Sequence, residues 1–162
     1  MAKVIRKAGI EDADAVWKIL EPVIRRGEAF AFPREMTQAE AIACWLSVDR
    51  ETFVVEENNQ IQGTYYLRQN QFGGGSHVAN CGYATAGYAR GQGIARLMCM
   101  HSLEEAKSRG FRAMQFNFVV SSNLVAVHLW KSLGFQIVGT LPDAFAHPTL
   151  GEVDAYVMFR KL

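Results

Sequence analysis

The sequence predicts an α+β protein, α/β by some conventions, with one mixed sheet flanked by helices. Three observations indicate this class. The first half of the chain has a strand, two helical segments and three strand-like segments in a row, and the second half alternates helix and strand. No internal repeat or linker-like stretch interrupts this order, so we expect one domain over residues 1–162. A composition of 49% hydrophobic and 20% charged residues is typical of a globular protein.

The N-terminal region predicts a strand and then a helix. Val4 to Ala8 form a short strand, and Asp12 or Asp14 is expected to cap the helix that follows. The apolar side chains of this helix recur at helical spacing: Val16, Ile19, Leu20, Val23 and Ile24. Pro22 lacks an N–H and its ring crowds the preceding turn, so we expect a kink or a break between two helical pieces. Gly27 ends this region.

A second helix and an antiparallel meander follow. Thr37 and Glu40 have the spacing of a capping box, and the helix that they open should end near Asp49. Strand-like segments then flank Asn58-Asn59, a pair that suits a tight hairpin turn. The expected strands of the meander are 53–55, 61–67 and 77–85. The remaining segments are helix 91–109, strand 113–120, helix 123–133, strand 135–141 and strand 153–160.

Between the meander and the next helix lies the turn Arg90-Gly91-Gln92-Gly93-Ile94-Ala95. The first N–H groups of a helix lack internal partners and lie at the positive end of its dipole, so glycines there let an anion approach closely. Arg90 adds a charge-assisted donor. The chain has no Gly-Lys-Ser or Gly-Lys-Thr triplet, and Arg96 stands where a dinucleotide fingerprint needs its third glycine. The alternative is a tight turn that binds nothing.

Two motifs give a specific resemblance to one family. Residues 90–95 fit R-x-x-G-x-A, which resembles the acyl-CoA diphosphate motif of the GCN5-related N-acetyltransferases. Residues 123–135 resemble the second motif of that family, N-x-x-A-x-x-L-Y-x-x-x-G-F, with Trp130 at the tyrosine position. The resemblance covers nearly the whole chain and implies acetyl-CoA as cosubstrate and a sheet whose fourth and fifth strands splay apart. It implies these residues for acetyl-CoA binding: Tyr83, Ala84, Thr85, Arg90, Gly91, Gln92, Gly93, Ile94, Ala95, Arg96 and Asn123. Asn123 is equally well explained as a helix N-cap, and both roles can hold.

The resemblance also implies that a bound amine attacks the thioester directly. The acyl-CoA arm would pair with the strand, and a backbone N–H near Tyr83 or Ala84 would stabilise the oxyanion. Asn117 is the side chain that we expect to act beside them in catalysis. An indole N–H does not release its proton, so we assign Trp130 no acid role, and the thiolate leaves directly or takes a proton from water. No carboxylate lies in residues 77–85, so the general base stays unassigned.

Three neutral amides are candidates for orienting the acceptor. Asn80 lies on one central strand, and Gln115 and Asn117 share a face of the next. With residues 116–118 leading into Asn123, this set is similar to the azetidine-2-carboxylate and proline-analogue acetyltransferase branch of the family. The alternative for Asn80 and Asn117 is buried hydrogen bonding at a strand end.

The loop after the first helix carries a further set of candidates. Glu28, Phe30 and Phe32 lie in the segment that in this family covers the acceptor, so we expect them to bind substrate and influence its choice. The alternative is an apolar contact under a loop.

The predicted function is transfer of an acetyl group from acetyl-CoA to the amine of a small molecule, an amino acid or its analogue. Two alternatives stay open: a protein or peptide amine as acceptor, and a non-catalytic acyl-CoA sensor, which the absent tyrosine and the absent strand carboxylate allow. A net charge of +1 without a basic run disfavours nucleic acid and anionic membranes as partners. The N-terminus has no apolar h-region, so we expect a cytoplasmic protein.

The cysteines and histidines do not indicate a metal site. The three cysteines include no C-x-x-C pair, and the four histidines lack the spacing that places two imidazoles on one helical face. We therefore expect no metal. Relatives of this kind often form homodimers, and the resemblance allows one here, but no residue indicates the contact surface.

Overall fold

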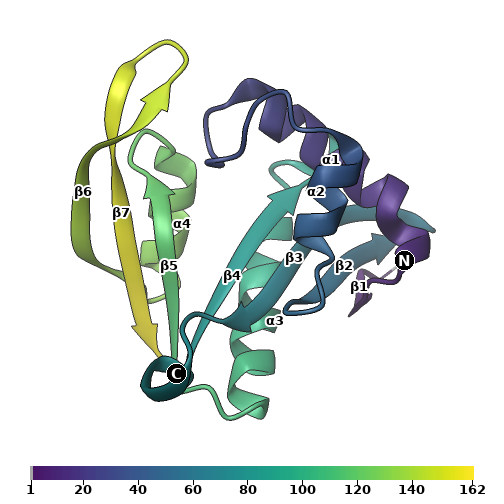
Figure 1. The fold of residues 1–162 in the computed structure, drawn as a ribbon. Coiled ribbons are helices and arrows are strands. Elements are labelled where there is room, and N and C mark those ends of the chain that lie inside the picture. Colours follow the sequence, from purple (N-terminus) through teal and green to yellow (C-terminus); the bar gives the residue numbers. More distant parts are fainter. Residues whose placement is uncertain (1) are drawn as a thin grey trace.

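The structure, a computed structural model, describes residues 2–162, which form a seven-stranded mixed sheet with two helices on each face (Figure 1). Its strands and longer helices are β1 (Val4–Lys7), α1 (Ala13–Arg26), α2 (Gln38–Trp45), β2 (Glu51–Glu57), β3 (Gln60–Gln69), β4 (Val78–Thr85), α3 (Ile94–Ser108), β5 (Ala113–Val120), α4 (Leu124–Ser132), β6 (Gln136–His147) and β7 (Gly151–Lys161). The strand order is β1-β2-β3-β4-β5-β7-β6, and β4 with β5 is a parallel pair in an otherwise antiparallel sheet. The predicted α+β class with a mixed sheet is confirmed.

Different helices cover the two faces of the sheet. α1 and α2 lie on one face, which we call the front face, and α3 and α4 lie on the back face (Figure 1). On the front, the Trp45 indole of α2 donates to the Thr64 hydroxyl of β3 at 3.1 Å. On the back, the next residue, Tyr65, hydrogen-bonds to His101 of α3 at 2.7 Å. Because side chains alternate along a strand, Tyr66 points to the front again.

Helix α1 runs without interruption from Ala13 to Arg26, so the predicted division into two pieces at Pro22 is wrong. Pro22 is exposed, and the carbonyl that loses its helical partner there belongs to Lys18, which is exposed as well. The apolar side chains of α1 that hold it against the sheet are buried: Val16, Ile19, Leu20 and Ile24. Packing of this face outweighs the missing hydrogen bond.

Asp12 stands at the N-cap position of α1, but its carboxylate does not cap the helix. Both of its oxygens accept from the Arg6 guanidinium at 2.9 Å, and one also accepts from the Gly9 N–H at 2.8 Å. Asp12 is 6% exposed. Its carboxylate therefore joins β1 to the start of α1.

We expect Asp12→Asn to lower the free energy of unfolding by about 1–2 kcal/mol at pH 7, because Arg6 is partly exposed and solvent weakens the lost ion pair. The hydrogen bonds from Arg6 hold the pKa of Asp12 below its usual range. This contribution is therefore complete above about pH 4 and is lost as the pH falls through the lowered pKa. Urea titrations of both proteins should show a smaller deficit at about pH 3; an equal deficit would exclude the ion pair as its source.

The predicted hairpin turn and the predicted capping box of the second helix are confirmed, whereas Asp12 does not cap α1 as predicted. Asn58 and Asn59 have φ of 53° and 61°, as a tight hairpin turn between β2 and β3 requires. The Thr37 hydroxyl accepts from the Glu40 N–H, and the Glu40 carboxylate accepts from the Thr37 N–H. The helix that they open ends at Trp45, earlier than predicted.

β6 is longer than the predicted strand 135–141. It passes through Pro142 and continues to His147, with Asp143 at φ 50° and a register shift against β7 between Leu141 and Phe145. A proline is tolerated here because β6 is the edge strand, where an absent N–H removes no ladder bond on the open side.

Candidate active site

β4 and β5 separate after two paired residues. Val78 pairs with Ala113 and Ala79 pairs with Met114, and within residues 2–162 no later residues of these strands pair with each other. β4 keeps its β3 partner as far as Thr85. From residue 80 onward the β5 side of β4 therefore has backbone groups without a strand partner, and Figure 1 shows the two strands diverging. The predicted splay is confirmed.

Asn80 lies where the strands separate. Its Nδ2 donates to the Gln115 carbonyl at 2.9 Å, and its Oδ1 accepts from Arg68 Nε at 3.2 Å. Gln115 is the first β5 residue beyond the last pair, so the Asn80 amide replaces the missing strand partner. Asn80 is 5% exposed. These contacts favour the structural alternative for Asn80 over contact with a substrate.

Asn117 lies further along the front of β5, within a chain of three amides. Gln115 Nε2 donates to Asn117 Oδ1 at 2.9 Å, and Asn117 Nδ2 donates to Asn70 Oδ1 at 2.7 Å. The structure therefore brings the predicted amides together. Asn117 is half-buried and keeps one N–H and one lone pair beyond these bonds. Its amide is oriented, yet it has capacity for a ligand.

The turn before α3 is open at the N-terminus of the helix. Gly91 and Gly93 have φ of 74° and 76°, and Gly93 is the N-cap, so α3 begins at Ile94 rather than at the predicted Gly91. A Cβ added to either glycine would meet no heavy atom within 4 Å. Among residues 2–162, none accepts from the backbone N–H groups of Ile94, Ala95 or Arg96. Donors at the positive end of a 15-residue helix thus border open space, as an anion site requires.

Two other predicted residues of this region use their side chains within the protein. Gln92 Nε2 donates to the Tyr88 carbonyl at 3.2 Å, which braces the turn. Arg96 donates to the Ser132 hydroxyl at 2.8 Å and so ties the first turn of α3 to the last turn of α4. Arg96 keeps further guanidinium N–H donors beyond this bond, so its side chain as well as its backbone N–H remains for an anion.

Arg26 is a residue near this turn that the sequence analysis does not single out. Burial and the nearby charge of Arg90 lower the pKa of Arg26, and the charge of Glu28 raises it. Arg90 is exposed. Two guanidinium groups that repel each other beside an open turn favour an anion between them. The charge of Glu28 thus acts on Arg26, and the substrate contact expected for Glu28 stays a prediction.

The loop after α1 reaches the front face through aromatic contacts. Phe30 lies 5.5 Å from Phe32 and 5.8 Å from Trp45, and Trp45 meets the edge of Tyr66 at 4.9 Å, all between ring centroids. Phe30 and Phe32 are half-buried. They therefore form the wall of the front face above Tyr66, and both the predicted substrate role and the apolar contact remain compatible with this placement.

The side chain of Tyr83 points to the back. Its hydroxyl hydrogen-bonds to Ser102 of α3 at 2.7 Å, and its ring lies 5.0 Å from Trp130 and 5.7 Å from Phe116. Burial raises the pKa of Tyr83 well above its usual value. The hydroxyl is thus a structural group, and it is the backbone of Tyr83 and Thr85 that faces the gap between the strands, whereas that of Ala84 bonds to β3.

A sequence model of the acetyltransferase (GNAT) family matches residues 15–135, about three quarters of the chain. The chain belongs to the GNAT family. The family and fold that the two motifs predict are confirmed, and the matched residues include both the splayed strands and the open turn.

Solved and curated proteins named as acetyltransferases resemble this chain over most of its length. A GCN5-related N-acetyltransferase from Kribbella flavida is 38% identical with a TM-score of 0.95, covering 99% of this chain and 98% of that one. YncA from Salmonella typhimurium, a putative acetyltransferase solved with acetyl-CoA, has the same fold with a TM-score of 0.86 at 21% identity, covering 100% and 95%. N-acetyltransferase aca1 of Schizosaccharomyces pombe is 31% identical over 112 residues, 67% of this chain, and the chain spans about half (53%) of its length.

The second GNAT motif is a packed helix with a capped start. Asn123 is the N-cap of α4, and its Oδ1 accepts from the Ala126 N–H at 3.3 Å, so the N-cap role is confirmed. Trp130 is 8% exposed and lies against Tyr83, Phe116 and Phe135. Where the motif of the family has a tyrosine, this chain has a core aromatic.

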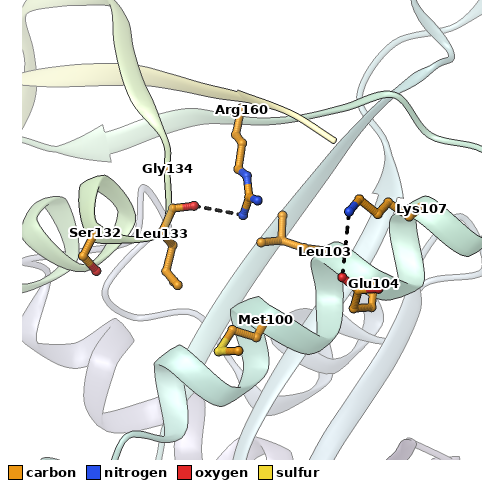
Figure 2. Close-up of a pocket in the computed structure, with 8 residues that line it drawn as sticks. All are labelled: Met100, Leu103, Glu104, Lys107, Ser132, Leu133, Gly134 and Arg160. Carbon is orange, nitrogen blue, oxygen red and sulfur yellow. Dashed lines mark hydrogen bonds and ion pairs between the residues drawn. The ribbon is translucent and has the colours of Figure 1, made fainter.

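Another cavity, of about 440 Å³, lies between α3, the end of α4 and β7 (Figure 2). It contains none of the predicted site residues: its lining is Met100, Leu103, Glu104, Lys107, Ser132, Leu133, Gly134 and Arg160. Its charged groups already have partners, since Arg160 donates to the Leu133 carbonyl at 2.9 Å and Lys107 lies 4.0 Å from Glu104.

None of the helices in residues 2–162 has the length and apolarity that a bilayer span requires.

Proposed function

We propose that this chain is an N-acetyltransferase that moves the acetyl group of acetyl-CoA to the amine of a small molecule. One observation supports this above all: the unpaired edge of β4 ends at a turn whose helical N–H groups border open space. A ligand that joins a diphosphate to an extended arm fits both features at once. Acetyl-CoA is such a ligand, and YncA of the same fold was solved with it.

The direction of the β4 backbone favours one oxyanion donor. Val78 accepts through its carbonyl from Asn70, and Ala86 donates to Gln62, so the even-numbered residues of β4 bond to β3. Residues alternate in an antiparallel strand, and the backbone of Tyr83 therefore points into the gap. The N–H of Tyr83 is the better candidate for the thioester oxygen, and that of Ala84 points toward β3.

In the proposed reaction the acceptor approaches from the front face. The amine nitrogen attacks the carbonyl carbon and forms the C–N bond, while the oxyanion is held by the Tyr83 N–H. The C–S bond then breaks, sulfur leaves as a thiolate, and the nitrogen gives its extra proton to water. Trp130 donates no proton, so water supplies the one that the thiolate takes. Asn117 is proposed to orient the acceptor.

We expect Asn117→Ala to lower kcat/KM for the acceptor about 10- to 100-fold and to leave the rise in melting temperature caused by acetyl-CoA unchanged. The reason is that Asn117 lies on β5, whereas the diphosphate site lies at the start of α3. The measurement is release of free thiol from acetyl-CoA with a panel of amines and cyclic amino acids. Absence of turnover on every amine, with the thermal shift retained, would replace the enzyme with an acyl-CoA sensor. A loss confined to acetyl-CoA binding would remove Asn117 from the acceptor side.

A further inference from the structure

Tyr66 of β3 lies directly over the backbone of β4. It is paired with Gly82, and a Cβ at position 82 would lie 2.6 Å from Tyr66 Cε1 and 2.9 Å from its hydroxyl oxygen. Only glycine leaves room for the ring there. The Tyr66 hydroxyl therefore lies on the front face beside Gly82. Gly82 belongs to the segment of β4 that is no longer paired with β5.

The Tyr66 hydroxyl has no hydrogen-bond partner among residues 2–162. Three other tyrosines of the chain do have one: Tyr65 bonds to His101, Tyr83 to Ser102 and Tyr88 to the Ile61 carbonyl. Tyr66 is half-buried, with its ring against the edge of Trp45. A hydroxyl held in place by its ring but left without a partner is available to a ligand.

Two arginines lie beside this ring. The Arg50 guanidinium is 4.1 Å from the ring centroid and that of Arg68 is 6.0 Å from it. Within residues 2–162 neither forms an ion pair with a carboxylate, and Arg50 Nε and Nη1 are buried without a hydrogen-bond partner. Burial raises the pKa of Tyr66 although both arginines lower it, so the hydroxyl keeps its proton at neutral pH.

Such surroundings suit a neutral amine. Nearby cations disfavour an ammonium ion, so they lower the pKa of a bound amine and favour its nucleophilic form. A hydroxyl oxygen that accepts a hydrogen bond from the amine N–H leaves the nitrogen lone pair free to attack.

We infer that the Tyr66 hydroxyl contacts the acceptor and holds its neutral amine beside the thioester, with Arg50 and Arg68 favouring the neutral form. This inference rests on the proposed function, since it assigns a substrate contact to the same site. It also answers a question that the sequence leaves open, because no carboxylate of residues 77–85 is present to take the amine proton.

The test is Tyr66→Phe, which keeps the ring over Gly82 and removes the hydroxyl. We expect kcat/KM for the acceptor to fall at least about tenfold, with KM for acetyl-CoA and the melting temperature unchanged. Tyr65→Phe is the matched control: it removes a hydroxyl from the same strand but from the back face, so it should lower the melting temperature and leave the acceptor kinetics unchanged.

A second arm uses the pH profile, which a merely structural role would not move. Arg50→Met should shift the acidic limb of the kcat profile to higher pH by about one unit, because the pKa of the amine in the enzyme–substrate complex rises when a nearby cation is removed. Arg50→Lys keeps the positive charge, so its acidic limb should lie at the same pH as that of the wild type. The other titratable groups whose charges act on the Tyr66 hydroxyl are Arg68 and the thiols of Cys44 and Cys81. Asp49 lies near both arginines, and all of these groups are retained in the variants.

The outcomes separate this inference from the proposed function. If the wild type acetylates an amine and Tyr66→Phe does so equally well, the Tyr66 contact is refuted and the acetyltransferase stands. If the acidic limb stays in place in Arg50→Met, the arginines do not favour the neutral amine. If the wild type acetylates nothing, the proposed function fails, and the Tyr66 contact fails with it.

Discussion

Gly93→Val is expected to weaken acetyl-CoA binding about 100-fold or more. Gly93 has φ 76°, a region that a β-branched residue enters only with strain, and its added side chain would occupy the space beside the α3 N–H groups. At a ligand concentration of about 100 wild-type Kd, acetyl-CoA stabilises the wild type by about 2.7 kcal/mol, and a 100-fold weaker site retains only about 0.4 kcal/mol. Thermal unfolding with and without acetyl-CoA measures this loss directly.

Gly110→Val supplies the control for backbone strain. Gly110 has φ 85° in the turn after α3, and an added Cβ would likewise meet no heavy atom within 4 Å. Both variants should lose stability without ligand, but only Gly93→Val should lose its response to acetyl-CoA. If acetyl-CoA changes the melting temperature of the two variants equally, the turn is not the diphosphate site. Backbone strain alone then explains the lower stability of both variants.

The open turn was predictable from local chemistry, and the splayed strands were predictable only through the resemblance of the two motifs to the family. Two glycines at the start of a helix constrain the backbone by themselves, and the order of strands determines which pair must be parallel. The role of Asn80 was not predictable in this way. It depends on the carbonyl of Gln115, 35 residues away, being left without a strand partner. The sequence predicts that both residues lie on strands, but it does not predict that they lie at the point where β4 and β5 separate.

The front-face cluster shows the same limit. Tyr66 and Arg68 share a face of β3 by alternation, which sequence could have indicated, but Arg50 joins them only because β2 pairs with β3. Arg26 likewise meets Arg90 only after α1 has packed on the sheet. The prediction at Pro22 is wrong for the opposite reason: local chemistry predicts a break in the helix, and the tertiary packing of α1 overrides it.

Trp130→Ala is expected to lower the free energy of unfolding by about 3–5 kcal/mol, since it leaves a cavity among packed aromatics. Its ring centroid lies 5.0 Å from those of Tyr83 and Phe116 and 6.4 Å from that of Phe135. The ring thus supports the back of β4 at the residue whose N–H is proposed to face the thioester. Chemical denaturation measures the stability, and the acetyl-CoA thermal shift shows whether the support is needed for donor binding.

Trp130→Phe separates this support from chemistry. It keeps an aromatic ring in the cluster and removes the indole N–H, so we expect kcat to stay within about threefold of the wild type while stability falls modestly. A tenfold or larger loss of kcat in a folded Trp130→Phe protein would mean that the indole N–H acts on the leaving sulfur as a hydrogen-bond donor. An unchanged kcat would mean that thiolate departure needs no side chain at this position, since a thiol with a pKa of about 8.5 is already a competent leaving group. The helix position that carries a tyrosine in the family motif would then serve this chain only by packing.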